Sequence, residues 1–153
     1  MKKYKKIALI LGVTGQDGSF MAELLLKKNY IVHGLARKSA TGNLKNVSKI
    51  IKNNKLFKIH HGDLLDFVSI TNIVSKIKPD EIYNFADQDH VGWSFELPTY
   101  SFAVTGGSVV NLLEIIKKYS HKSKFFQPLS SNMFASSKNA KQNENEPLTP
   151  RSI

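Results

Sequence analysis

The chain alternates short apolar runs with longer stretches whose apolar residues recur at helical spacing. The runs suit strands buried on both faces, and the spaced residues suit one face of a helix. Repeated strand–helix alternation forms βαβ units with right-handed crossovers. The sequence therefore predicts an α/β fold, a doubly wound parallel sheet left incomplete at about five strands. Strands are expected at 7–11, 31–35, 56–60, 82–85 and 124–129, and helices at 20–28, 44–51, 67–77 and 100–119.

The composition excludes several classes of protein. With 41% hydrophobic residues in 153, the chain can bury a core and is not fully disordered. It has no cysteine, which rules out disulfides, thiolate metal sites and a cysteine nucleophile. The longest apolar run, 7–11, is far too short for a membrane span or signal peptide. We therefore expect a cytoplasmic protein with no membrane partner.

The charge is strongly basic, with 22 Lys+Arg against 12 Asp+Glu and a net charge of +10. Such a balance fits either a nucleic-acid-binding protein or a lysine-rich solvated surface. The chain has no basic motif interleaved with aromatic residues of the RNA-binding kind. We therefore favour the surface interpretation and expect no nucleic-acid partner, although the charge would attract a small anionic ligand.

A glycine-rich segment joins the first expected strand to the first expected helix. In a strand–turn–helix context, such glycines permit a tight turn, close approach of a pyrophosphate and close helix packing. The helix N-terminus would then face the negative charge of the phosphates. The alternative is a glycine turn without a ligand. The candidate cofactor-binding residues of this segment are Gly12, Thr14, Gly15, Gln16, Asp17 and Gly18.

Two cations follow the second expected strand. NAD-selective sites carry Asp or Glu about 20 residues beyond the glycines, to hold the ribose 2′-hydroxyl. This chain has Arg37 and Lys38 at that place, with Ser39 next. An Arg–Lys pair suits the dianionic 2′-phosphate of NADP, which Arg can bind bidentately. The sequence therefore predicts NADP as the cofactor; the alternative is that both residues belong to the basic surface.

The third expected strand runs into His60, His61, Gly62, Asp63 and Leu64. Asp63 falls at the carboxyl end of a strand, where ligands bind in open α/β sheets. The two histidines have no histidine or carboxylate partner at helical spacing, so we expect no metal and interpret them as strand-end residues.

The Gly-x-x-Gly-x-x-Gly spacing resembles that of extended short-chain dehydrogenases/reductases, Rossmann-type enzymes that act on nucleotide sugars. Other segments narrow the resemblance to the GDP-mannose 4,6-dehydratase family and extend it over nearly the whole chain. These segments are 14–19, 22–26, 32–34, 62–64, 81–84, residue 88, 90–91, 94–96 and 150–152. The resemblance implies that the chain corresponds to about the N-terminal half of a family member.

The family likeness implies a lyase that converts GDP-mannose to GDP-4-keto-6-deoxymannose with tightly held NADP, on the route to GDP-fucose. It also implies a homo-oligomer. Residues 1–135 would form the NADP-binding domain, and 136–153 a loop leading to a catalytic Tyr-x-x-x-Lys motif that would begin after Ile153. The implied roles are cofactor binding by Asp63, Leu64, Phe85 and Ala86, substrate binding by Gln88, Asp89, Ser94 and Glu96, and catalysis by the hydroxyl of Ser130.

The chain departs from the family pattern at several of these positions. Asn132 stands where the family has its catalytic glutamate. An amide does not exchange protons at neutral pH, and losing one acid/base role costs roughly 10²–10⁴-fold in rate. Asp87 and Asp89 replace small or hydroxyl residues, and Thr105 replaces Asp or Asn. We therefore expect the 153 residues to be inactive alone. Two alternatives are a catalytically dead nucleotide-binding remnant and another nucleotide-sugar epimerase or dehydratase.

Overall fold

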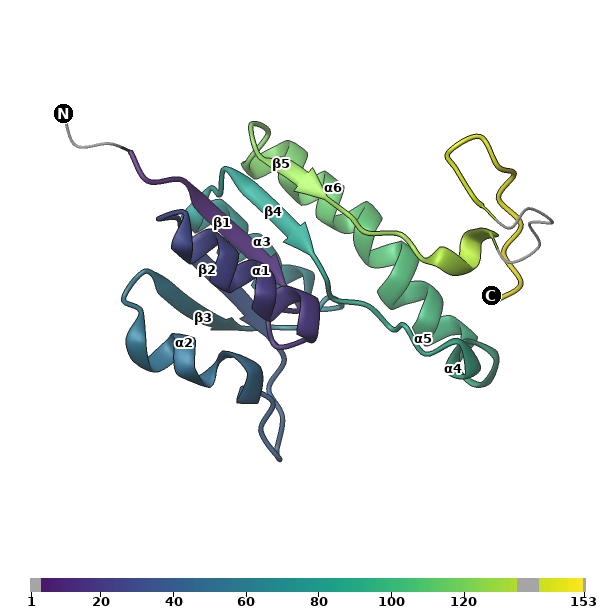
Figure 1. Cartoon of the computed structure of the whole chain (residues 1–153), viewed down its shortest axis with the longest axis horizontal. Coiled ribbons are helices and arrows are strands. Elements are labelled where there is room, and N and C mark those ends of the chain that lie inside the picture. The colour runs from purple at the N-terminus through teal and green to yellow at the C-terminus, as the bar shows by residue number, and fades with distance from the viewer. Residues whose placement is uncertain (1–3, 135–140, 153) are drawn as a thin grey trace.

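The computed structural model describes residues 4–134 and 141–152. Its five strands form one sheet in the order β3-β2-β1-β4-β5 (Figure 1). All four neighbouring pairs are parallel. The winding direction reverses between β1 and β4, because the chain returns from β3 at one edge to the other side of β1. The predicted doubly wound sheet is thus confirmed. Its strands are β1 (Ile7–Leu11), β2 (Ile31–Ala36), β3 (Phe57–His61), β4 (Glu81–Asn84) and β5 (Lys124–Phe126).

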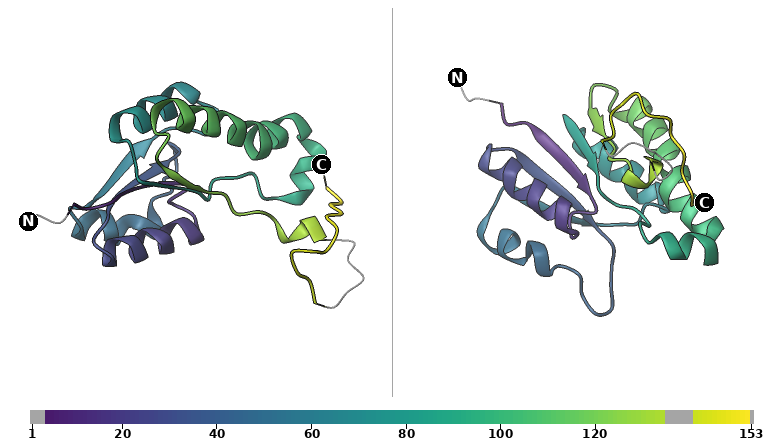
Figure 2. Two further views of the ribbon diagram at one scale, coloured as in Figure 1. Left: turned by 90° about the horizontal axis from the view of Figure 1, so that it is seen from above. Right: turned by 45° about the vertical axis from the view of Figure 1, so that its right-hand side comes forward.

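Helices cover both faces of the sheet (Figure 2). On one face lie α1 (Gln16–Lys27) and α2 (Ser48–Asn53), the latter preceded by the short η1 (Lys45–Val47); on the other lie α3 (Phe67–Ile77) and α6 (Ser108–Tyr119). The side chains of β1 alternate between the two cores. Leu9 and Leu11 pack with α3 and α6, whereas Ala8 and Ile10 pack with α1 and α2. Burial on both faces explains why β1 is uniformly apolar.

The helical region after β4 differs from the prediction. The expected helix 100–119 begins earlier and is divided into α5 (Pro98–Phe102), a π-helical turn η2 (Ala103–Gly107) and α6. Pro98 fits the first turn of α5 because its missing N–H has no acceptor there. A further helix, α4 (Val91–Glu96), was not predicted, since six residues are too few to show a helical period.

The continuous helical stretch Pro98–Tyr119 is, by length and composition alone, apolar enough to cross a membrane. Three of its α6 side chains, Leu112, Ile115 and Ile116, are instead buried against the sheet and α3. The apolar side chains of α6 therefore form part of the hydrophobic core between this helix, α3 and the sheet. The absence of a membrane partner stays a prediction.

Other boundaries shift for local reasons. α1 begins at Gln16 rather than at 20, because its first turn continues directly from the glycine segment. β5 ends at Phe126 rather than at 129, since Pro128 has no N–H to give to a strand ladder. Helix α3 has the predicted bounds. The described part of the predicted loop, 141–152, contains no helix or strand, and the proposed boundary at 135 lies outside the described residues.

Candidate functional site

The glycine turn lies at the carboxyl end of β1 and leads into α1. Gly12 has a φ of +74°, and a Cβ there would lie 2.7 Å from the backbone of Phe85 and Ala86. A Cβ on Gly18 would collide with the Gly12 carbonyl oxygen. Gly15 differs, because its Cβ would meet only that oxygen, at 3.4 Å. Gly12 and Gly18 therefore allow the chain to pack closely, as predicted, while Gly15 leaves open space in front of the helix.

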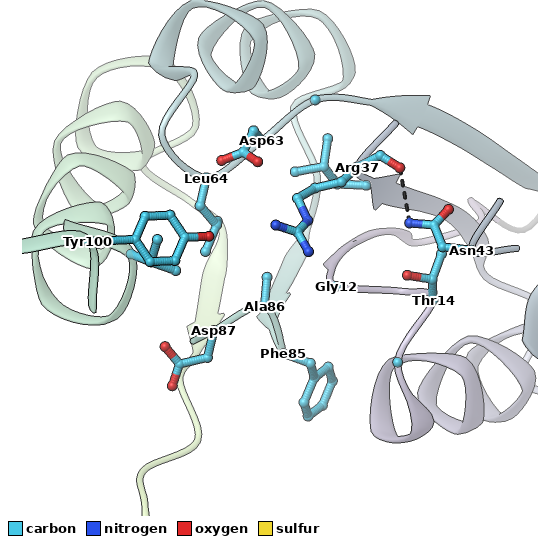
Figure 3. Close-up of a pocket in the computed structure, with 14 residues that line it drawn as sticks. Gly12, Thr14, Arg37, Asn43, Asp63, Leu64, Phe85, Ala86, Asp87 and Tyr100 are labelled. Carbon is cyan, nitrogen blue, oxygen red and sulfur yellow. Dashed lines mark hydrogen bonds between the residues drawn. The ribbon is translucent and has the colours of Figure 1, made fainter. Parts of the chain in front are cut away.

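A cavity of about 340 Å³ opens in front of this turn, across the ends of β1, β2 and β4 (Figure 3). It brings together most of the predicted cofactor-binding residues: Gly12, Thr14, Gly15, Arg37, Asp63, Leu64, Phe85 and Ala86. The predicted Gln16, Asp17, Gly18 and Lys38 do not line it. Leu35, Asn43, Tyr100 and Val104 line it without having been predicted. We call this space the first cavity.

Arg37 and Lys38 also meet in a shallower cavity of about 460 Å³, together with His61, Asp63 and Asp66. We call it the outer cavity. Arg37 lines both spaces, so its guanidinium lies where they join. In Figure 3 that guanidinium points into the first cavity, between Leu64 and the glycine turn. His61 was predicted only as a strand-end residue; its position makes it a third basic side chain beside Arg37 and Lys38.

Two asparagines fix the segment after Arg37. The Asn43 side-chain amide donates to the Arg37 carbonyl at 3.0 Å, within the segment, and that of Asn46 donates to the Thr14 carbonyl at 2.9 Å. The second bond connects the segment to the glycine turn. Neither asparagine belongs to a recognisable motif, so sequence reasoning missed both.

Within the sheet, His33 of β2 and His60 of β3 form a hydrogen-bonded pair. His33 Nδ1 lies 2.7 Å from His60 Nε2, and the rings stack with 5.0 Å between centroids. Burial, and then the charges of His60 and Lys58, lower the pKa of His33 to about 4. Burial, Lys58 and Lys76 likewise lower the pKa of His60. Both shifts favour the uncharged imidazoles near pH 7, so the pair is a neutral contact between β2 and β3. Among the described residues, no group of three His, Cys, Asp or Glu is placed to hold a metal ion.

A second cavity, of about 470 Å³, lies between the end of β4, the helices α4 and α5, and the segment after β5. It collects five predicted residues, Gln88, Asp89, Ser94, Ser130 and Asn132, whereas the predicted Glu96 does not line it. Asp87 lines both the first and the second cavity, so the two spaces adjoin.

Hydrogen bonds fix several side chains of the second cavity. The Gln88 side-chain amide donates to the Ser101 hydroxyl at 2.9 Å, and the Ser94 hydroxyl donates to the Val91 carbonyl at 2.7 Å. The Ser130 hydroxyl oxygen accepts from the Asn132 backbone N–H at 3.1 Å. Ser130 and Asn132 are thus adjacent in one turn, where a hydroxyl and an amide face the same space.

Comparison with known proteins agrees with this geometry. A family model described as GDP-mannose 4,6 dehydratase matches residues 9–153. GDP-mannose 4,6-dehydratase of Vibrio cholerae serotype O1 is 41% identical over 97% of this chain and 41% of its own length. The human GDP-mannose 4,6 dehydratase is 38% identical over 99% of this chain and 43% of its own length. The chain therefore spans about two fifths of the relatives it matches.

Solved structures show the same fold. The UDP-Glc/GlcNAc 4-epimerase of Campylobacter jejuni superposes with a TM-score of 0.86 at 22% identity, covering 96% of this chain and 44% of that enzyme. The UDP-glucose 4-epimerase of Thermus thermophilus gives 0.81 at 26% identity, covering 95% and 45%. The sheet, the glycine turn and the match over residues 9–153 lead to one assignment. This chain belongs to the GDP-mannose 4,6-dehydratase family.

Proposed function

We propose that the chain binds NADP in the first cavity, with the adenosine 2′-phosphate in the outer cavity. The observation that carries the proposal is the Arg37 guanidinium at the junction of the two spaces. A dinucleotide fits this part of the chain, because Gly15, the N-cap of α1, provides no side-chain cap and leaves open space. Uncapped N–H groups at a helix start bind phosphate well. The Thermus thermophilus epimerase is a complex with NAD, which supports a dinucleotide here.

The choice between NADP and NAD is tested by titrating both into the chain and into two variants. We expect the wild-type chain to bind NADP more tightly than NAD. Arg37→Met should weaken NADP binding by roughly 10–100-fold, the loss expected for charge-assisted hydrogen bonds, and leave NAD nearly unchanged. Lys38→Met removes the other cation of the outer cavity and should also weaken NADP binding, but by less, because lysine does not bind a phosphate bidentately. Tighter binding of NAD by the wild type would refute NADP preference.

For the whole protein we propose the family reaction, conversion of GDP-mannose to GDP-4-keto-6-deoxymannose. When bound, NADP would accept a hydride from the sugar and later return it. In this chain, the second cavity adjoins the cofactor groove through Asp87 and offers Gln88, Ser94 and Ser130 as polar groups for a sugar. The Ser130 hydroxyl can donate a hydrogen bond to a sugar oxygen, because its own oxygen already accepts from the backbone.

A second candidate, a chain that binds nucleotides without turnover, is favoured by Asn132. Its amide neither gives up nor takes up a proton at neutral pH, so it cannot act as the acid or base of the elimination, as a carboxylate would. The 153 residues also contain no Tyr-x-x-x-Lys sequence. Incubating the chain with NADP and GDP-mannose distinguishes the two candidates. We expect bound NADP and no 4-keto-6-deoxy product; robust turnover would establish the 153 residues as an enzyme and eliminate the binding-only candidate.

A further inference from the structure

Among the described residues, lysine and arginine side chains line the groove of adjoining cavities only at its β2 end. Arg37 and Lys38 lie there in the outer cavity, which the carboxylates of Asp63 and Asp66 also line. Asp87 lies at the β4 end, where the first cavity meets the second, and Asp89 lies beyond it. Figure 3 shows Asp87 below Tyr100, well away from the Arg37 guanidinium. Among the described residues that line the second cavity, none is lysine or arginine.

The Asp87 carboxylate is held in place. The Thr105 hydroxyl donates to Asp87 Oδ1 at 2.6 Å, and the Gln88 backbone N–H donates to the same oxygen at 2.7 Å. One bond comes from η2 and the other from the next residue of the chain, so the side chain cannot swing away from the groove without losing them. A fixed charge costs less reorganisation on ligand binding than a mobile one, so its interaction with a charged ligand is better retained.

We propose that Asp87 makes this site prefer the oxidised over the reduced form of the dinucleotide. The inference rests on the proposed function, which puts the adenosine at the β2 end. The other end of an extended dinucleotide then falls at the β4 end, beside Asp87. The oxidised nicotinamide ring carries a positive charge, and the reduced ring is neutral. A carboxylate attracts only the charged ring by Coulomb interaction, so it strengthens binding of NADP⁺ and leaves that of NADPH nearly unchanged.

The test compares dissociation constants for both redox forms, with NADPH followed by its fluorescence and NADP⁺ by competition. In wild type we expect tighter binding of NADP⁺. In Asp87→Asn, whose amide oxygen can still accept from Thr105 and Gln88, we expect NADP⁺ to bind roughly fivefold more weakly, as for a partly exposed charge pair, with NADPH little changed. The control is Glu114→Gln, which removes one negative charge from an exposed position on α6, outside the lining of both cavities.

The outcomes separate the two proposals. A fall in the NADP⁺ preference of Asp87→Asn, but not of Glu114→Gln, supports the role of Asp87. Unchanged preference in Asp87→Asn, with both forms binding, overturns that role and leaves the dinucleotide site intact. Equal loss in both variants assigns the effect to net charge and also overturns it. If the wild-type chain binds neither form, the proposed function itself fails, and the inference falls with it.

Discussion

At the residue scale, Gly15 and Gly18 belong to one motif but differ in role: we expect Gly15 to matter for ligand binding and Gly18 for the stability of the fold. Gly15→Ala should leave stability nearly unchanged, because Gly15 has a φ of −72° and its Cβ would have only one neighbour, at 3.4 Å. The same methyl group would point into the space proposed for the pyrophosphate, so we expect NADP affinity to fall roughly tenfold, the equivalent of one weakened phosphate contact. Gly18→Ala should instead lower the free energy of unfolding by about 1–3 kcal/mol, since its methyl group overlaps the backbone of Gly12 and Val13.

Urea unfolding and NADPH fluorescence titration, made on both variants, measure the two effects separately. If Gly15→Ala unfolded as easily as Gly18→Ala, the space in front of α1 would be needed for packing rather than for a ligand. If Gly15→Ala bound NADPH as tightly as wild type, the pyrophosphate would not lie against this turn.

Residues of the site could be predicted from the sequence only where a short motif carries them. Gly12, Gly15 and Arg37 fall at fixed offsets from the ends of β1 and β2, and all three line the first cavity. Asn46 and Tyr100 reach the site from segments that follow no such spacing. Their positions depend on how η1 and α5 pack, which is a tertiary property that local patterns do not encode.

At the element scale, α3 depends on its N-cap. The Asp66 side chain accepts from the Ser69 backbone N–H at 3.1 Å, satisfying a donor that the helix itself leaves free. Asp66→Ala should therefore lower the free energy of unfolding by about 1 kcal/mol, measured by urea denaturation. Asp66→Asn is the matched control, because asparagine caps as well as aspartate and should cost little. Equal losses in both variants would place the contribution in the charge rather than in the cap.

Among the elements, those with a clear start, stop and period were predicted best. Helix α3 has a capping aspartate, a regular apolar stripe and a left-handed Lys78 before Pro79, and its predicted bounds agree with the structure. The region after β4 lacks such signals. There α4 and α5 have six and five residues, and η2 contains two consecutive glycines, so neither length nor period marks where one element ends. The second cavity is built on this region, which is why its shape could not be predicted.

At the scale of the whole molecule, the cavities and a stabilising hydrogen-bond network lie at opposite ends of the parallel strands. The cavities lie at the carboxyl ends of the strands, whereas Glu81 lies at the amino end of β4. Glu81 accepts from Lys6 at 3.0 Å, Tyr30 at 3.2 Å and Tyr83 at 2.8 Å. Burial raises the pKa of Glu81, but the hydrogen bonds outweigh it and lower that pKa. This network connects the starts of β1 and β2 to β4 and does not contact the cavities. Substitutions of cavity-lining residues should therefore change ligand binding and leave the contribution of this network to stability nearly unchanged.

The His33–His60 pair should make the whole fold less stable in mild acid. Burial, His60 and Lys58 lower the pKa of His33 to about 4, whereas a histidine in the unfolded chain titrates near 6.5. Between these values the unfolded chain binds the extra proton, so stability is full above pH ~6.5 and falls as the pH drops toward 4. We expect a loss of about 1–2 kcal/mol at pH 5 relative to pH 7. Glu81 adds to the loss only at lower pH, because its pKa lies below its ordinary 4.5.

Urea unfolding at pH 7, 6 and 5 measures this dependence. His33→Gln keeps a hydrogen-bonding side chain but removes the titrating ring, so its free energy of unfolding should vary less with pH than that of wild type. His121→Gln is the matched control, since it replaces one exposed histidine that lies outside the pair. Equal slopes in His33→Gln and wild type would show that the buried imidazole pair is not what links folding to protons. A reduced slope in His33→Gln alone would assign that linkage to the His33–His60 contact between β2 and β3.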